Sequence, residues 1–269
     1  MNIVNAIMTN NPCYKRHKKF TPKGLMLHSV GVNQPAAKAF ISQWNKSTYR
    51  TSCVHGVIDA SSGDIYQTLP WNYAGWHGGG TSNNTHIGVE MCEPSQIKYS
   101  SGARFTVMNI QAAQVQVRKT YKAAVELFAY LCKTYNLDPL KKGVIVSHSE
   151  GHKQGIASNH ADPEHLWKGL SMSYTMDGFR KDVAAQMGIK PPEPSYGTNK
   201  KPEAFTPYRV RIKVTNLNIR TGPSTNYTSR GHIEPGVYTI VDEKSGWGLL
   251  KAYSGGRNGW ISLNYANKV

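Results

Sequence analysis

The chain has 269 residues, of which 39% are hydrophobic and 18% charged, a composition typical of a folded globular protein and not of a disordered one. Its 32 Lys and Arg against 16 Asp and Glu give a formal net charge of +16. Such a charge favours a polyanionic partner, which could be nucleic acid, an acidic membrane or a bacterial wall with phosphate polymers, and charge alone does not choose among them. The length suits one medium domain and a small one.

The first residues, MNIVNAIMTNNPCYKRHKKF, do not resemble a signal peptide. Their apolar run is short, Asn2 and Asn5 interrupt it, and the positive charges follow it. No stretch reaches the length of a transmembrane helix. We therefore expect a protein made in the cytoplasm without a signal peptide, which acts on targets outside only after release. The four cysteines include no CxxC pair, which argues against a zinc ribbon and favours buried free thiols.

Strands and helices alternate along the first 188 residues. Apolar, partly β-branched runs predict strands at 24–30, 53–59, 64–70, 87–93 and 143–148. The spacing of apolar residues predicts helices at 34–45, 111–136 and 174–187, and in 111–136 the apolar side chains form one continuous stripe that belongs to the core. We expect an α/β domain over 1–188, with a central mixed sheet flanked by helices.

The composition changes after this domain. Residues 189–207 are rich in proline and charge and predict a semi-stiff linker. Residues 208–269 consist of short β-like runs separated by Gly, Pro and Asn, which predicts a small all-β domain. Nine of the ten histidines precede the linker, so we expect the chemistry to lie in the first domain.

Five polar residues stand at the ends of predicted strands or in the loops that follow: His28, Glu90, His148, His160 and Asp162. Each alone has a structural explanation, such as a buried ion pair or a turn. Polar groups at such positions are costly to bury unless they are paired or bind a metal, and α/β folds place sites at strand ends. Together they offer two histidines and a carboxylate for a catalytic zinc, a carboxylate to move a proton, and a donor for an oxyanion.

The segment HSEGH at 148–152 indicates a competing zinc site. His148 and His152 are spaced as in the HExxH helix of zinc peptidases. However, the glutamate stands at the wrong offset, and Gly151 and Gly155 disfavour a helix. The glycine-rich GWHGGG at 75–80 lacks the Lys-Ser/Thr pair of a phosphate-binding loop.

In the order of its motifs, the first domain resembles the type 2 zinc N-acetylmuramoyl-L-alanine amidases, a superfamily that includes phage amidases and peptidoglycan recognition proteins. The resemblance runs from LMLHSVG to HADPEHLW through HGVID, GDIYQ, YAGWHGGG and IGVEMCE. It implies that Zn²⁺ is bound by His28, His148 and Asp162, with Glu90 and His160 as the catalytic residues. The loop between His148 and Asp162 has 13 residues, longer than in the shorter bacterial members, which leaves His152 or His160 as alternative third ligands.

The segment from about 208 resembles a bacterial SH3-like barrel domain, through LNIRTGPS and the closing GWISLNY. This resemblance implies a module that binds the cell wall. Joined to an amidase, it implies a phage or prophage endolysin that lyses a Gram-positive host, with peptidoglycan and anionic wall polymers as partners and without nucleic-acid binding or membrane insertion. A bacterial autolysin would look similar. The alternatives are a non-enzymatic peptidoglycan binder and a zinc peptidase that cuts within the stem peptide.

Overall fold

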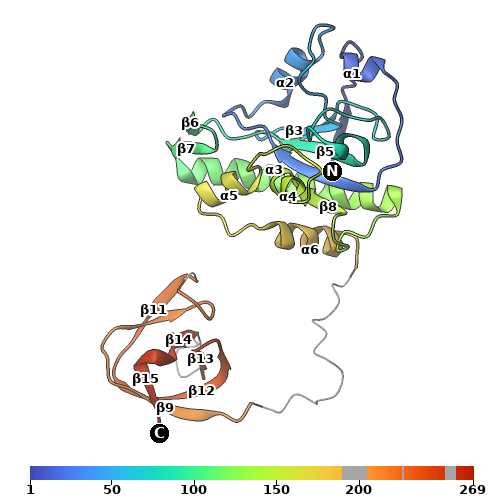
Figure 1. Ribbon diagram of the computed structural model, residues 1–269. Coiled ribbons are helices and arrows are strands. Elements are labelled where there is room, and N and C mark those ends of the chain that lie inside the picture. The colour runs from blue at the N-terminus through green and yellow to red at the C-terminus, as the bar shows by residue number, and fades with distance from the viewer. Residues whose placement is uncertain (190–204, 226, 252–258) are drawn as a thin grey trace. The chain divides into compact units, whose positions relative to one another are not determined.

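The computed structural model describes residues 1–189, 205–225, 227–251 and 259–269 (Figure 1). The chain divides into two compact units, residues 1–193 and 194–269. Most of the predicted linker 189–207 lies outside the described residues. Within the described ranges, no helix combines the length and apolar character needed to cross a membrane.

The first unit is built on a six-stranded sheet with the order β1-β4-β3-β5-β2-β8. These strands are β1 (Ile3–Asn5), β4 (Ile65–Gln67), β3 (Gly56–Ile58), β5 (His86–Met91), β2 (Gly24–Ser29) and β8 (Ile145–Ser147). Strands β3, β5, β2 and β8 run parallel to one another. Strand β4 is antiparallel to β3 and parallel to β1. The predicted α/β class with a central mixed sheet is thereby confirmed.

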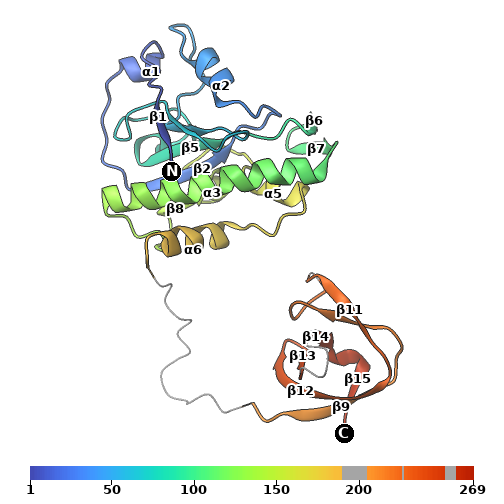
Figure 2. The ribbon, with the colours of Figure 1, turned by 180° about the vertical axis from the view of Figure 1, so that it is seen from behind.

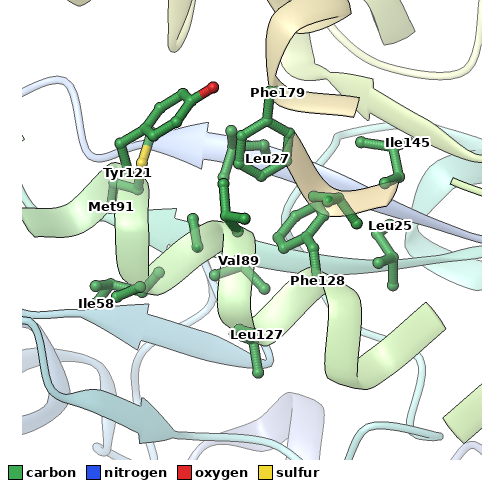
Figure 3. Close-up of a cluster of buried hydrophobic side chains, with 14 of the residues drawn as sticks. Leu25, Leu27, Ile58, Val89, Met91, Tyr121, Leu127, Phe128, Ile145 and Phe179 are labelled. Carbon is green, nitrogen blue, oxygen red and sulfur yellow. The ribbon is translucent and has the colours of Figure 1, made fainter. Parts of the chain in front are cut away.

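One face of this sheet packs against the long helix α3 (Ile110–Tyr135), with α6 (Met176–Gln186) packed on α3 (Figure 2). The predicted stripe of α3 is buried in the core, where it meets alternate residues of β2 and β5 (Figure 3). These core side chains include Leu25, Leu27, Val89, Met91, Val117, Tyr121, Phe128 and Leu131. Because successive side chains of a strand point to opposite faces, His28 and Glu90 project from the face away from α3.

Shorter elements complete the unit. They are α1 (Pro12–Lys15), α2 (Ala37–Trp44), the 3-10 helix η1 (Thr81–Asn84), the hairpin of β6 (Ile97–Ser101) and β7 (Arg104–Val107), α4 (His148–Lys153) and α5 (Glu164–Gly169). A second apolar cluster lies around α1 and α2 and contains Phe40, Trp44 and Leu69. All four cysteines are free and buried, as predicted.

The prediction that glycine disfavours a helix at 148–152 is wrong. His148 does not end strand β8 but begins helix α4. The Ser147 hydroxyl accepts the Glu150 N–H at 3.0 Å, and the Glu150 carboxylate accepts the Ser147 N–H at 3.2 Å, which forms a capping box. Gly151 is needed for close packing, because an added Cβ would lie 2.6 Å from Cε of Met26. The cap and this contact outweigh the low helix propensity of glycine.

The second unit is a seven-stranded sheet with the order β11-β10-β14-β13-β12-β9-β15. Its strands are β9 (Tyr208–Ile212), β10 (Leu217–Arg220), β11 (Ser229–Ile233), β12 (Gly236–Lys244), β13 (Trp247–Leu250), β14 (Trp260–Ser262) and β15 (Ala266–Lys268), with the 3-10 helix η2 (Leu263–Tyr265) before the last strand. Isoleucine, leucine and valine side chains form its core. The all-β class is confirmed. The pairings among the described residues do not join β11 to β15, so the SH3-like barrel stays a prediction.

Candidate active site

A cavity of about 890 Å³ opens at the ends of β2 and β5 in the first unit. All five residues singled out from the sequence line this cavity: His28, Glu90, His148, His160 and Asp162. They come from segments up to 134 residues apart in the chain. The fold therefore gathers in one place the residues that the sequence placed at separate strand ends and loops.

The sheet register explains how this gathering arises. His28 on β2 is the direct register partner of Glu90 on β5, so both side chains leave the same face of the sheet. His148 follows β8, the strand on the other side of β2. Asp162 comes from the loop before α5, and its carboxylate accepts the backbone N–H of Ser29 at 3.4 Å.

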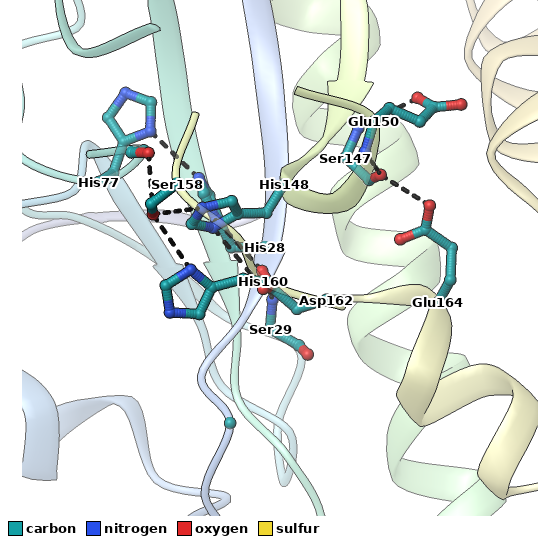
Figure 4. Close-up of polar contacts among 12 residues, drawn as sticks. His28, Ser29, His77, Ser147, His148, Glu150, Ser158, His160, Asp162 and Glu164 are labelled. Atoms are coloured by element: carbon teal, nitrogen blue, oxygen red, sulfur yellow. Dashed lines mark hydrogen bonds and ion pairs between the residues drawn. The ribbon is translucent and has the colours of Figure 1, made fainter. Parts of the chain in front are cut away.

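Three side chains converge at the centre of the site (Figure 4). Nδ1 of His28 lies 3.0 Å from Nδ1 of His148 and 3.2 Å from Oδ2 of Asp162. Nδ1 of His148 lies 3.6 Å from Oδ1 of Asp162. Tetrahedral zinc with bonds of about 2.0–2.2 Å places its ligand atoms about 3.4 Å apart, so these distances suit a bound zinc. In the described part of the chain, no other group of three or more His, Cys, Asp or Glu converges in this way.

Hydrogen bonds behind the two histidines orient their rings. Nε2 of His77 lies 3.0 Å from the carbonyl of His86, so it carries the proton and leaves Nδ1 of His77 to accept from Nε2 of His28 at 3.1 Å. Nε2 of His148 lies 3.1 Å from the Ser158 hydroxyl. These partners direct Nδ1 of both His28 and His148 inward, as the outer partners of metal-binding histidines do.

The charges at this centre also fit a cation. Burial lowers the pKa of His148 to about 4, and the charge of His28 acts in the same direction. Burial also lowers the pKa of His28, but the hydrogen bond to Asp162 and the charges of Glu90 and Asp162 outweigh burial, so the pKa of His28 is raised above its ordinary value. Burial opposes ionisation of Asp162, yet its bond to His28 keeps its pKa below the ordinary value. An ionised carboxylate and two imidazoles form a donor set that Zn²⁺ prefers.

Glu90 faces the same cavity with an unmet hydrogen-bonding capacity. Its Oε2 is buried and has no hydrogen-bond partner among the described residues. Burial raises the pKa of Glu90 to about 7, although the charge of His28 lowers it in part. A carboxyl group that titrates near neutrality can both accept and return a proton.

His160 and His152 occupy different surroundings. Nδ1 of His160 lies 3.1 Å from the Ser158 hydroxyl, and its ring centroid lies 4.4 Å from that of His148. His152 is exposed, does not line the cavity, and its Nδ1 lies 3.4 Å from the carbonyl of Ala157. Of the three alternatives for the third ligand, Asp162 is the one whose ligand atom converges with His28 and His148.

Several cavity residues were not assigned a role from the sequence. His77 and Ser158 hold the two central histidines, as described above. Tyr99, from the β6–β7 hairpin, donates to Oε2 of Glu93 at 2.6 Å and lies 2.7 Å from Nε2 of His165. Gly88 leaves room for the ring of His77, since an added Cβ would lie 2.3 Å from Cγ of His77, but this packing is visible only in the structure.

A family comparison decides what this fold and site belong to. The sequence model of the N-acetylmuramoyl-L-alanine amidase family matches residues 18–165, more than half of the chain. The chain belongs to this family. The amidase resemblance and the enzyme class expected from it are thereby confirmed. The match covers the three central ligand candidates together with Glu90 and His160.

Individual relatives of this chain are distant. N-acetylmuramoyl-L-alanine amidase XlyA of Bacillus subtilis (strain 168) is 29% identical over 110 residues, 38% of this chain and 35% of XlyA. The match thus spans about a third of the length of that curated relative. The crystal structure of Staphylococcus aureus hydrolase AmiA in complex with its ligand has a TM-score of 0.54 and 20% identity, and covers 70% of this chain and 83% of that one. The likeness to AmiA shows a shared fold. The catalytic domain of XlyA gives a TM-score of 0.46 at 22% identity, over 68% of this chain and 99% of that one.

Proposed function

We propose that this chain hydrolyses the amide bond between the lactyl group of N-acetylmuramic acid and L-alanine in peptidoglycan. The convergence of His28, His148 and Asp162 beside Glu90, in one cavity of an amidase-family unit, carries this proposal. Zn²⁺ would be bound by Nδ1 of the two histidines and the Asp162 carboxylate. When bound, zinc supplies a Lewis acid that polarises the scissile carbonyl and lowers the pKa of water.

Glu90 acts as the proton carrier of the reaction. Its carboxylate takes a proton from the water whose oxygen attacks the scissile carbonyl carbon. It then gives that proton to the departing nitrogen of L-alanine as the C–N bond breaks. The products are a lactyl carboxylic acid and a free amine. The pKa of about 7, the place of Glu90 in the cavity lining, and its buried Oε2 without a partner among the described residues support both roles.

His160 stabilises the negative charge that develops on the carbonyl oxygen. Ser158 lies at hydrogen-bond distance from Nδ1 of His160 and restrains its ring. With Nδ1 of His160 directed at Ser158, its Nε2–H would serve as the donor to this oxygen, and such donors contribute most where negative charge develops in the transition state. The position of His160 in the cavity lining supports this role.

The second unit is proposed to be an SH3-like domain that binds the cell wall. Its all-β fold and the motif LNIRTGPS support this assignment. An amidase joined to such a module is typical of a phage or prophage endolysin that acts on the wall of a Gram-positive host. The net charge of +16 suits a wall that carries anionic polymers.

Product analysis tests the activity. Purified peptidoglycan is digested with the full-length protein, with the Glu90→Gln variant as the control, and the fragments are identified by mass spectrometry. We expect new L-alanine amino termini and N-acetylmuramic acid with a free lactyl carboxyl group. Cleavage between residues of the stem peptide would instead indicate a zinc peptidase, and binding without cleavage would indicate a non-enzymatic binder. Either result would overturn the proposal.

A further inference from the structure

The first unit carries a run of exposed basic residues outside the site described above. Residues 15–19 read KRHKK, and all five are exposed. No Asp or Glu occurs before Asp59, so nearby sequence does not neutralise this charge. Among the described residues, no carboxylate forms an ion pair with the lysines or the arginine of this run. The run is therefore an open cationic surface.

This segment is fixed against the stretch of chain that leads to Trp76. The carbonyl of Lys18 accepts the N–H of Ala74 at 2.7 Å, and the carbonyl of Asn72 accepts the N–H of Phe20 at 2.9 Å. The guanidinium of Arg16 lies 5.2 Å above the ring centroid of Trp76. Because Trp76 lines the cavity, the basic run reaches the cavity edge.

A second basic stretch adjoins the first. The side-chain amide of Asn11 donates to the carbonyls of Trp44 at 2.9 Å and Ser52 at 3.2 Å, which ties the loop after α2 to α1. Lys46 and Arg50 of this loop are exposed, and Arg50 lines the cavity. We define the basic rim as these six cations of the two stretches: Lys15, Arg16, Lys18, Lys19, Lys46 and Arg50.

We propose that the basic rim binds a linear phosphodiester polymer of the cell wall beside the mouth of the amidase cavity. This inference rests on the proposed function, because hydrolysis of peptidoglycan places the protein at the cell wall, where such a polymer occurs. Several cations in a row match a chain of regularly spaced phosphates better than they match a single stem-peptide carboxylate. Polymer bound there would hold the enzyme on the wall with its cavity next to the substrate.

The rim lacks the features that other polyanions require. A membrane surface is bound by cations flanked by exposed apolar side chains, and none of the exposed large hydrophobic residues in the described ranges lies in 11–20 or 44–52, the segments that carry the rim. Single-stranded nucleic acid is bound by free aromatic platforms. Here Tyr14 and Tyr73 are stacked on each other, with centroids 5.8 Å apart, and are half-buried.

The test compares two charge-matched variants of the full-length protein. The rim variant carries Lys15→Gln, Lys18→Gln and Lys19→Gln. The control carries Lys122→Gln, Lys133→Gln and Lys141→Gln, three exposed lysines that do not line the cavity. The probe is labelled poly(glycerol phosphate), titrated at several salt concentrations. We expect the rim variant to raise the Kd about tenfold. The negative slope of log K against log salt should become shallower by about 2, because binding with fewer phosphate contacts releases fewer counterions.

Each further outcome has a defined meaning. The control variant should keep the wild-type Kd, and both variants should hydrolyse a soluble muropeptide at the wild-type rate. A rim variant with wild-type Kd, or an equal loss in both variants, would overturn the proposal. Wild-type binding to a DNA oligonucleotide or to phosphatidylglycerol vesicles that is as tight as binding to the polymer would also overturn it. Absence of muropeptide hydrolysis in the wild type would refute the proposed function and leave polymer binding intact.

Discussion

At the scale of single residues, two neighbouring carboxyl groups have different surroundings and so different roles. Glu90 lines the cavity and keeps a buried oxygen without a partner among the described residues. Glu93 is fully buried and accepts hydrogen bonds from the Tyr99 hydroxyl and the Gly31 N–H. Burial raises the pKa of each to about 7, so the pKa alone does not distinguish them. Access to the cavity assigns the chemistry to Glu90.

Replacing Glu90 with Gln removes the proton carrier and leaves the shape of the side chain. We expect kcat on a soluble muropeptide to fall by at least about 100-fold, the lower end of the range for loss of a general acid–base. Bound zinc and the thermal midpoint should stay at wild-type values. The matched control is His152→Ala, since this exposed residue lies outside the cavity lining, and it should keep full activity. A Glu90→Gln variant with wild-type kcat would remove Glu90 from the mechanism.

Glu93 predicts a pH dependence of stability. Burial raises its folded-state pKa from 4.5 to about 7, against the hydrogen bond from Tyr99, so the folded state binds more protons than the unfolded state between these values. Stability from this group is therefore present at low pH and is lost as the pH rises toward 7. The unfolding free energy of Glu93→Gln minus that of wild type should therefore rise by about 2–3 kcal/mol from pH 5 to pH 8. Urea denaturation at both pH values measures this difference, and an unchanged difference would contradict it.

The sequence predicted the five central residues because of where they stand along the chain. Parallel strands bring their carboxyl ends to one edge, so a polar residue at each strand end indicates a shared site. His77 and Ser158 could not be predicted in the same way. His77 contacts His28, and Ser158 contacts His148 and His160, from loops whose paths depend on packing far away in the chain.

At the scale of elements, the segments that carry His148 and Asp162 are joined behind the site. The Ser147 hydroxyl donates to Oε1 of Glu164 at 2.7 Å and accepts the Glu150 N–H at 3.0 Å (Figure 4). Arg180 on α6 binds the two carboxylate oxygens of Glu150 at 2.8 and 3.0 Å. Helices α4, α5 and α6 are thereby linked through one hydroxyl and one guanidinium.

Loss of the Ser147 hydrogen bonds should lower the affinity of the proposed metal site. We expect Ser147→Ala to weaken zinc binding about 10-fold, the lower end of the range for loss of an outer partner of a ligand, because Ser147 acts one step further out through Glu150 and Glu164. The cap of α4 is lost as well, at a cost of about 1 kcal/mol in unfolding free energy. Competition with a coloured chelator measures the zinc affinity. Ser147→Thr, which keeps the hydroxyl, should restore it. Wild-type zinc affinity in Ser147→Ala would show that the Ser147 hydrogen bonds do not affect the site.

Long elements were predictable and short ones were not. Helix α3 spans 110–135 where the sequence predicted 111–136, because a stripe over seven turns leaves little ambiguity. Helix α4 has six residues and depends on the Ser147 cap, and the β6–β7 hairpin has only nine residues in its strands. Such elements are formed by tertiary contacts, which the sequence pattern does not report.

At the scale of the whole molecule, division into two compact units predicts separable tasks. A chain truncated to residues 1–189 should hydrolyse soluble muropeptides at the rate of the full-length protein, because every residue that lines the cavity is retained. It should sediment less with intact walls, because the second unit is proposed to bind them. Equal sedimentation of the two proteins would refute the wall-binding role of the second unit.

Zinc-dependent recovery of hydrolysis tests the central claim most directly. The full-length protein is stripped with a chelator, and zinc is titrated back while release of L-alanine-terminated peptide from a soluble muropeptide is followed. We predict that activity is lost on stripping and returns with one equivalent of zinc in wild type and in His152→Ala. Asp162→Ala should not recover. Full hydrolysis without zinc, or full recovery in Asp162→Ala, would contradict a zinc site formed by His28, His148 and Asp162.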